Sequence, residues 1–172
     1  KLRVHGERKR YYHDLVGVNS RLDSIQAAVL NVKLRHLDDW TAKRQKHAEQ
    51  YDEAFGPARD LGLETPRRPG GQARHIYNQY VIRVPGGHRD ALREHLKEQG
   101  IGTEIYYPVP LHLQECFEYL DYKPGDLPES ERAAQETLAL PVYAELTKAQ
   151  LDHVAGTITA YLRERMPVQS TT

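Results

Sequence analysis

Apolar residues recur every three or four positions between Leu22 and Phe55, a spacing that places them on one face of a helix. Ser20 and Asp23 have the spacing of a capping box, which predicts that the helix begins there. Gly56-Pro57 ends it, because proline cannot continue the hydrogen-bond ladder. A helix of this length typically bridges two domains or packs against a partner subunit. The apolar positions are Leu22, Ile25, Val29, Val32, Leu37, Trp40, Ala48, Tyr51 and Phe55.

The rest of the chain predicts short strands and helices in turn. Residues 1–20 and 57–74 are rich in polar residues, glycine or proline and are expected to be irregular. Clustered β-branched and aromatic residues predict a strand over 77–84, and Gly100 is a stop signal for a helix beginning near residue 88. A short sheet with helices on one face, a small α+β domain, follows from this order. The other predictions are a strand at 103–107 and helices at 113–120, at 129–138 and after the capping box Thr147-x-x-Gln150.

Composition excludes several classes of protein. Lysine plus arginine equals aspartate plus glutamate at 24 each, so there is no basic excess to bind nucleic acid. Cys116 is the only cysteine, which excludes an intrachain disulfide and fits a reducing, cytoplasmic compartment. No apolar run approaches the ~20 residues of a membrane helix. The sequence opens with polar and charged residues and not with an apolar signal region, so no signal peptide is expected. Histidines 75, 88 and 95 lack the spacing of a metal site, so no metal is expected.

Three segments carry a family resemblance: Gly17–Leu30, Gly100–Gln114 and Leu138–Thr147. In sequence and in order they resemble the DegT/DnrJ/EryC1/StrS family of sugar aminotransferases, which use pyridoxal 5'-phosphate. The resemblance implies the C-terminal part of a fold type I enzyme, homodimeric, with active sites built from both chains. Residues 1–56 would hold the cofactor-phosphate loop and a long interdomain or dimer helix at the end of the large domain. Residues 57–166 would form the small α+β domain, and 167–172 a disordered tail.

Asn19 and Arg21 are the candidate cofactor-binding residues. An amide and a guanidinium placed before a helix offer donors that suit a phosphate. Spacing alone favours an asparagine that shapes the turn and an exposed arginine, because turns are far more frequent than anion sites. The resemblance implies the phosphate role, with the asparagine reaching the cofactor of the neighbouring subunit.

Tyr106, Tyr107 and His112 are the candidate substrate-binding residues. Polar aromatic tips on a proline-stiffened segment suit a wall that recognises a hydroxylated ligand. The alternative is a buried turn in which the tyrosines pack to bury apolar surface and the histidine is structural. Many relatives have His-Tyr-Pro where this chain has Tyr106-Tyr107-Pro108, so Tyr106 stands in place of the histidine. The replacement keeps a hydrogen-bonding group at the tip of the side chain but not an imidazole. His112 matches the Pro-Leu-His of the family and would line the same entrance.

The implied reaction moves an amino group, usually from glutamate, to a keto-sugar nucleotide for amino-sugar biosynthesis. The family's Schiff-base lysine is expected upstream of Lys1, so this segment holds no catalytic residue and alone is expected to be inactive. Two alternatives stay open. One is a sugar 3-dehydratase of the same family, in which a histidine replaces the lysine. The other is a non-catalytic regulatory or dimerisation module.

Overall fold

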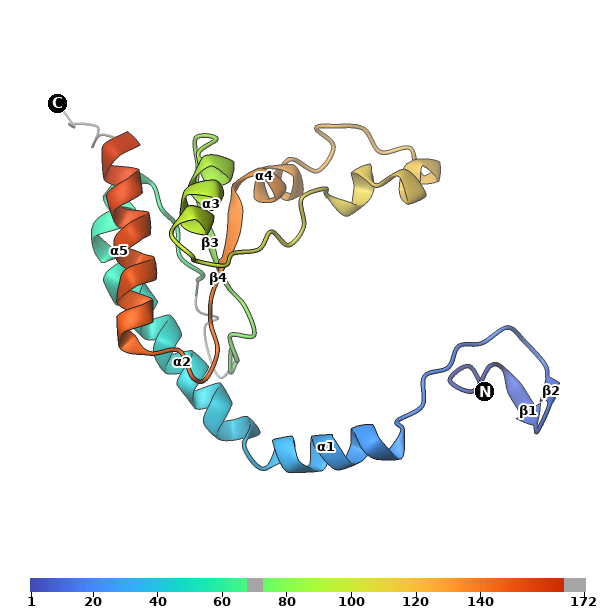
Figure 1. The fold of residues 1–172 in the computed structure, drawn as a ribbon. Coiled ribbons are helices and arrows are strands. Elements are labelled where there is room, and N and C mark those ends of the chain that lie inside the picture. Colours follow the sequence, from blue (N-terminus) through green and yellow to red (C-terminus); the bar gives the residue numbers. More distant parts are fainter. Residues whose placement is uncertain (68–72, 166–172) are drawn as a thin grey trace. The chain divides into compact units, whose positions relative to one another are not determined.

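The chain, described in a computed structural model over residues 1–67 and 73–165, divides into two compact units, Lys1–Asp38 and Asp39–Thr172. The second unit is an α+β arrangement of helices and a short sheet, which is the predicted fold class (Figure 1). The division falls within segment 1–56, so most of the predicted long helix groups with the small domain and not with the loop that precedes it. The tail predicted at 167–172 lies outside the described residues.

The first unit contains more regular structure than the sequence predicts. β1 (Glu7–Lys9) and β2 (Tyr12–His13) form a short antiparallel hairpin where an irregular stretch is expected. α1 (Ser24–Leu34) begins after Asp23, whose backbone N–H donates to Gln26 Oε1 at 3.3 Å. The capping box is therefore Asp23-x-x-Gln26, three positions later than predicted from Ser20.

The predicted continuous helix is wrong, because it breaks after Leu34 and resumes as α2 (Leu37–Ala54). At the break the backbone N–H of His36 donates to the carbonyl of Lys33 at 3.0 Å, a turn tighter than that of an α-helix. Neither glycine nor proline marks this position, and the apolar spacing continues across it. The sequence therefore carried no signal for the break.

The apolar stripe is buried only in its second half. Ala48 and Tyr51 of α2, with Phe55 after it, are fully buried. By contrast α1 has no buried residue, and its Ile25 is 82% exposed. The stripe therefore forms core in the second unit and an open apolar face in the first.

The sheet of the second unit centres on a strand that the sequence analysis missed. β3 (Tyr80–Arg83) pairs antiparallel with β4 (Thr137–Leu140), and Glu104 bridges Ala139 on the other edge of β4. The predicted helix at 129–138 is shorter, since α4 ends at Glu136 (α4, Pro128–Glu136). The predicted strand at 103–107 forms only that bridge. The run Thr137–Leu140 continues a helical apolar spacing, so only pairing across the sheet makes it a strand.

Helices cover one face of this sheet (Figure 1). α3 (Arg89–Glu98) is followed by Gly100 at a φ of 73°, the left-handed stop predicted for it. α5 (Lys148–Arg165) begins with the predicted box, in which Thr147 N–H donates to Gln150 Oε1 at 2.9 Å. The remaining turns are the 3-10 helices η1 (Gly56–Leu61), η2 (Leu111–Leu113) and η3 (Glu115–Leu120). The largest fully buried side chains are Tyr51, Phe55, Tyr80, Ile82, Val84, Leu92, Leu96, Leu138, Leu151, Ile158 and Leu162.

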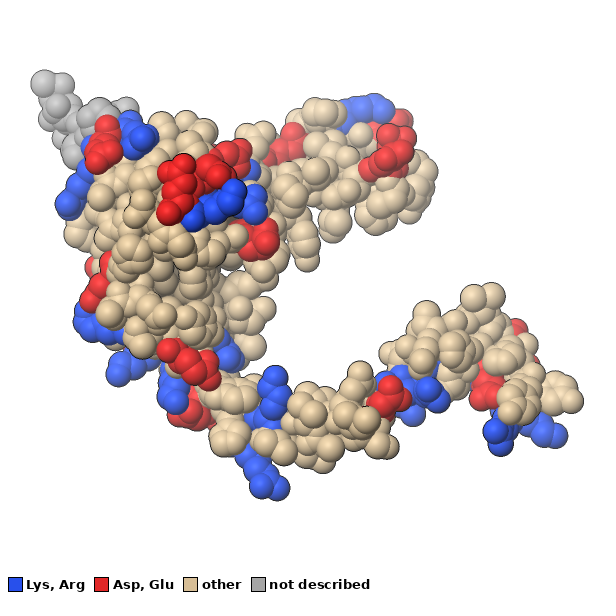
Figure 2. All heavy atoms as spheres, viewed as in Figure 1, with Lys and Arg blue, Asp and Glu red and all other residues tan. Residues whose placement is uncertain are grey.

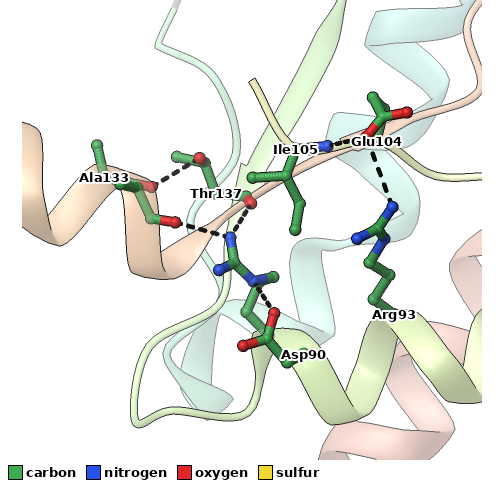
Figure 3. A network of polar contacts seen from close by, with 8 residues as sticks. Asp90, Arg93, Glu104, Ile105, Ala133 and Thr137 are labelled. Carbon is green, nitrogen blue, oxygen red and sulfur yellow. Dashed lines mark hydrogen bonds and ion pairs between the residues drawn. The ribbon is translucent and has the colours of Figure 1, made fainter. Parts of the chain in front are cut away.

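The buried guanidinium of Arg89 joins α3 to the junction of α4 and β4. Asp90 and Thr137, two of its partners, are labelled in Figure 3. Its Nη1 donates to the carbonyls of Ala134 and Thr137, each at 2.9 Å, and its Nε to Asp90 at 2.6 Å. The two carbonyls belong to the end of a helix and the start of a strand, where backbone acceptors lack regular partners. Arg89 therefore fixes the point at which α4 becomes β4.

Replacing Arg89 with alanine is expected to lower the free energy of unfolding by about 2–4 kcal/mol, because two buried carbonyls lose their charged donor. Urea titration followed by circular dichroism measures this change. Arg93→Ala in the same helix is the control, since it breaks only a half-exposed pair with Glu104 at 3.5 Å. The control is expected to lose less than about 1 kcal/mol. Equal losses in the two variants would contradict the role of Arg89.

Candidate functional site

The loop that carries Asn19 and Arg21 is held by its backbone. Val18 N–H donates to the carbonyl of Leu2 at 2.8 Å, and Ser20 N–H donates to that of Arg3 at 2.9 Å. The Asn19 side chain accepts a hydrogen bond from Arg21 Nε at 3.0 Å. The loop thus orients two side chains that also contact each other, three to five residues before the first residue of α1.

The donors of this pair suit a phosphate. Both side chains are exposed, and within residues 1–67 and 73–165 Arg21 forms no ion pair. The hydrogen bond between the two side chains uses the Arg21 Nε–H and the Asn19 amide oxygen. The guanidinium Nη groups and the Asn19 Nδ2 group therefore remain as donors. Phosphate accepts hydrogen bonds and carries negative charge, which both groups match. The residues present therefore fit the phosphate of the cofactor that the sequence resemblance implies.

Tyr106 and Tyr107 lie in the segment that follows the bridge between Glu104 and Ala139. Their rings meet edge to face with centroids 6.3 Å apart across a cis peptide bond, and both phenols are exposed. Tyr106 lines a cavity of about 300 Å³, while Tyr107 is not among its lining residues. The structure thus brings Tyr106, and not Tyr107, to this cavity.

The Tyr106 cavity includes polar residues that the sequence analysis did not single out. Asn78, Gln79 and Glu104 line it beside Tyr106. They meet there because β4 pairs with β3 on one edge and with Glu104 on the other. No local pattern marks these residues, since strand pairing between distant segments brings them together.

His112 is buried and contacts another side chain of the protein. Its Nε2 donates to Glu131 Oε1 at 3.0 Å, and its ring lies edge-on to Tyr122 at 6.0 Å. The same carboxylate accepts the backbone N–H of Gly125 at 2.8 Å. The His112 hydrogen bond, followed by that of Gly125, holds the pKa of the Glu131 carboxyl below its ordinary value. These contacts favour a structural histidine that ties η2 to α4, while a role toward substrate stays a prediction.

Elsewhere in the described residues, neither the surface charges nor the possible metal ligands indicate a particular kind of ligand. Figure 2 shows acidic and basic side chains beside one another on the face drawn of the second unit. Within the described part of the chain, no group of three or more His, Cys, Asp or Glu side chains could hold a metal ion. None of the described helices is long and apolar enough to cross a membrane. The loop before α1 and the Tyr106 cavity each present a defined set of hydrogen-bonding groups.

Comparison with known proteins identifies the family of the chain. The profile of the DegT/DnrJ/EryC1/StrS aminotransferase family matches residues 1–159. The chain is 48% identical over 162 residues to the pleiotropic regulatory protein of Geobacillus stearothermophilus, covering 94% of this chain and 43% of that relative. It is 36% identical over 149 residues to the dTDP-3-amino-3,4,6-trideoxy-alpha-D-glucose transaminase of Streptomyces venezuelae, covering 87% of this chain and 38% of the relative.

The fold matches solved structures as well. The crystal structure of DesV from S. venezuelae superposes with a TM-score of 0.81 at 34% identity, covering 94% of this chain and 42% of that one. The chain thus spans about two fifths of the length of the proteins it matches.

Replacing Glu131 with glutamine is expected to flatten the acid side of the stability profile. A carboxyl whose pKa is lowered by folding stabilises the fold above its unfolded pKa, and this contribution is lost as pH falls through the folded pKa. Glutamine does not titrate, so the variant should lose less stability than the wild type as pH falls below the ordinary value of 4.5.

Thermal unfolding between pH 3 and 7, in steps of about half a unit, measures the difference. Glu129→Gln in the same first turn of α4 is the control, because Glu129 forms an exposed ion pair with Arg132 and has no bond to His112. Parallel profiles for the wild type and Glu131→Gln would show that the His112–Glu131 contact carries no such linkage.

Proposed function

We propose, from the premise that the chain belongs to the DegT/DnrJ/EryC1/StrS aminotransferase family, that it is the C-terminal segment of a sugar-nucleotide aminotransferase. The whole protein would use pyridoxal 5'-phosphate and move an amino group from glutamate to a keto-sugar nucleotide. The observation that supports this most is the exposed Asn19–Arg21 donor pair, in a segment that the family profile matches. The relative from S. venezuelae is named a transaminase of a dTDP-linked sugar, which supports this substrate class.

Asn19 and Arg21 are proposed to hold the phosphate of the cofactor across a homodimer. The amide Nδ2 group and the guanidinium Nη groups would donate to phosphate oxygens, and the bond between the two side chains would keep them aligned. When bound, pyridoxal 5'-phosphate supplies the electron-withdrawing ring and the carbon that carries the amino group. The contribution of this chain is then to anchor and orient, not to react.

The 106–112 segment is proposed to form the substrate side of the site. The Tyr106 phenol can donate to and accept from a sugar hydroxyl, and Tyr107 offers the same groups beside it. His112 is proposed to line the entrance, where its bond to Glu131 would hold the wall in place. A wall that is already ordered would reduce the entropy lost when a flexible nucleotide sugar is positioned.

A regulatory protein is the second candidate function. The name of the G. stearothermophilus relative describes regulation, and that relative is 48% identical to this chain. A regulator without amino transfer would not need an aldehyde cofactor, so cofactor binding by the full-length protein separates the two candidates. The dehydratase alternative differs in the reaction product, which lacks a hydroxyl and gains no nitrogen.

The full-length protein, incubated with glutamate and a 3-keto or 4-keto sugar nucleotide, is expected to form 2-oxoglutarate and an amino sugar in equal amounts. Mass spectrometry of the nucleotide sugar and an enzymatic assay of 2-oxoglutarate measure both products. A dehydrated sugar with no 2-oxoglutarate would select the dehydratase. Absence of both products, together with no cofactor binding, would select the regulator.

Replacing Arg21 or Asn19 with alanine is expected to weaken retention of pyridoxal 5'-phosphate by about tenfold or more, because each loses a hydrogen bond to a charged group. Both residues are exposed, so the unfolding midpoint without cofactor should stay unchanged. Cofactor absorbance after equilibrium dialysis of the full-length dimer measures the dissociation constant. Arg163→Ala, which removes an exposed arginine in the last turn of α5, is the matched control. Unchanged cofactor affinity in both site variants would refute the phosphate role.

A further inference from the structure

The Tyr106 cavity lies at the end of the sheet where three segments converge. Residues 78–79 precede β3, residues 139–142 close β4 and continue past it, and residues 102–106 run along the other edge of β4. The cavity holds about 300 Å³ and is open to solvent on one side. Its walls are backbone of the sheet and of its extensions, so the polar side chains on them stand on rigid elements.

The chemistry of the lining suits a neutral ligand rich in hydroxyls. Asn78 and Gln79 supply amides, Thr103 and Tyr106 supply hydroxyls, and Glu104 supplies a carboxylate. Amides and hydroxyls both donate and accept, as sugar hydroxyls do. Among the residues that the structure describes, Glu104 is the one charged residue of the lining, which includes no lysine or arginine. The cavity therefore offers hydrogen bonds to a sugar and a negative charge, but no cation to receive an anion.

Glu104 keeps one oxygen available for a ligand. Its Oε1 accepts the backbone N–H of Ile105 at 2.9 Å and lies 3.5 Å from Arg93 Nη2 (Figure 3). Both contacts use Oε1, which leaves Oε2 to accept from a hydroxyl. Arg93 lines a separate groove with Asp90 and Lys97 and is not among the residues of the Tyr106 cavity. The arginine therefore offsets the charge of Glu104 from outside the cavity.

We propose that this cavity receives the hexose of the nucleotide sugar and that Glu104 selects a hexose with a neutral C6 over a hexuronate. The inference rests on the proposed function, which brings a nucleotide-linked sugar to the wall that Tyr106 forms. A hexuronate would place its carboxylate near that of Glu104 with no cation in the lining to neutralise it. Repulsion between two like charges, in a medium between water and protein interior, weakens binding by about tenfold.

The full-length protein is tested with two matched probe pairs, UDP-glucose against UDP-glucuronate and dTDP-glucose against dTDP-glucuronate. The members of each pair differ only at C6. Isothermal titration of the wild type is expected to give about tenfold tighter binding of the neutral member. Glu104→Gln keeps the size of the side chain and an acceptor, so it should reduce the ratio to less than about threefold, mainly by a gain for the uronate.

Two further variants sharpen the test. Arg93→Gln removes the cation that offsets Glu104, and the preference for the neutral sugar is expected to widen. Glu94→Gln removes a carboxylate that pairs with Lys97 and does not line the cavity, so it should leave the ratio unchanged. Opposite changes in the Glu104 and Arg93 variants separate a local charge effect from loss of structure.

Three results would overturn the inference: equal binding of the two sugars by the wild type, the same ratio in Glu104→Gln, or no binding of any of the four probes. Amino transfer from glutamate is measured separately on the same preparations. Preserved discrimination without amino transfer would refute the proposed function and leave the cavity assignment standing. Amino transfer without discrimination at C6 would support the proposed function and refute the cavity assignment.

Discussion

The pairing of β4 on both of its edges is the contact on which the second unit depends. Its alternate residues Leu138 and Leu140 enter the core, while Ala139 bridges Glu104 through two backbone hydrogen bonds of 2.7 and 3.1 Å. Arg89 holds the start of the strand. Beyond its end, the Tyr51 hydroxyl donates to the carbonyl of Pro141 at 3.0 Å. One buried strand thus links the hydrophobic core to the wall of the Tyr106 cavity.

The first unit follows a different constraint, because its helix has no core of its own. α1 spans 11 residues, and isolated helices of that length are marginal in water. Its apolar side chains, such as Ile25 and Val29, are more than half exposed within the chain. Under the proposed function, the rest of a dimeric enzyme would cover this face. The same assembly would bring Asn19 and Arg21 to a neighbouring subunit's cofactor.

Local signals predicted the parts of the fold that depend on local chemistry. The box Thr147-x-x-Gln150 and the stop at Gly100 were confirmed because capping and left-handed backbone are set by neighbouring residues. The strand Thr137–Leu140 was missed because pairing across the sheet decides it, and the break after Leu34 was missed because no glycine or proline marks it. The motifs identified the family, which the profile match confirms. The cavity residues Asn78, Gln79 and Glu104 needed the structure, because three segments distant in sequence supply them.

His112 shows why a motif can mark a position without defining what the side chain does there. A buried imidazole needs a hydrogen-bond partner, and Glu131 supplies one while also accepting the N–H of Gly125. That carboxylate therefore closes the loop between η3 and α4 around the histidine. A Pro-Leu-His motif at this place is explained by the loop alone, whether or not the ring reaches a sugar. Hydrogen bonds to the substrate can then come from polar groups of the cavity wall, such as Tyr106 and Glu104.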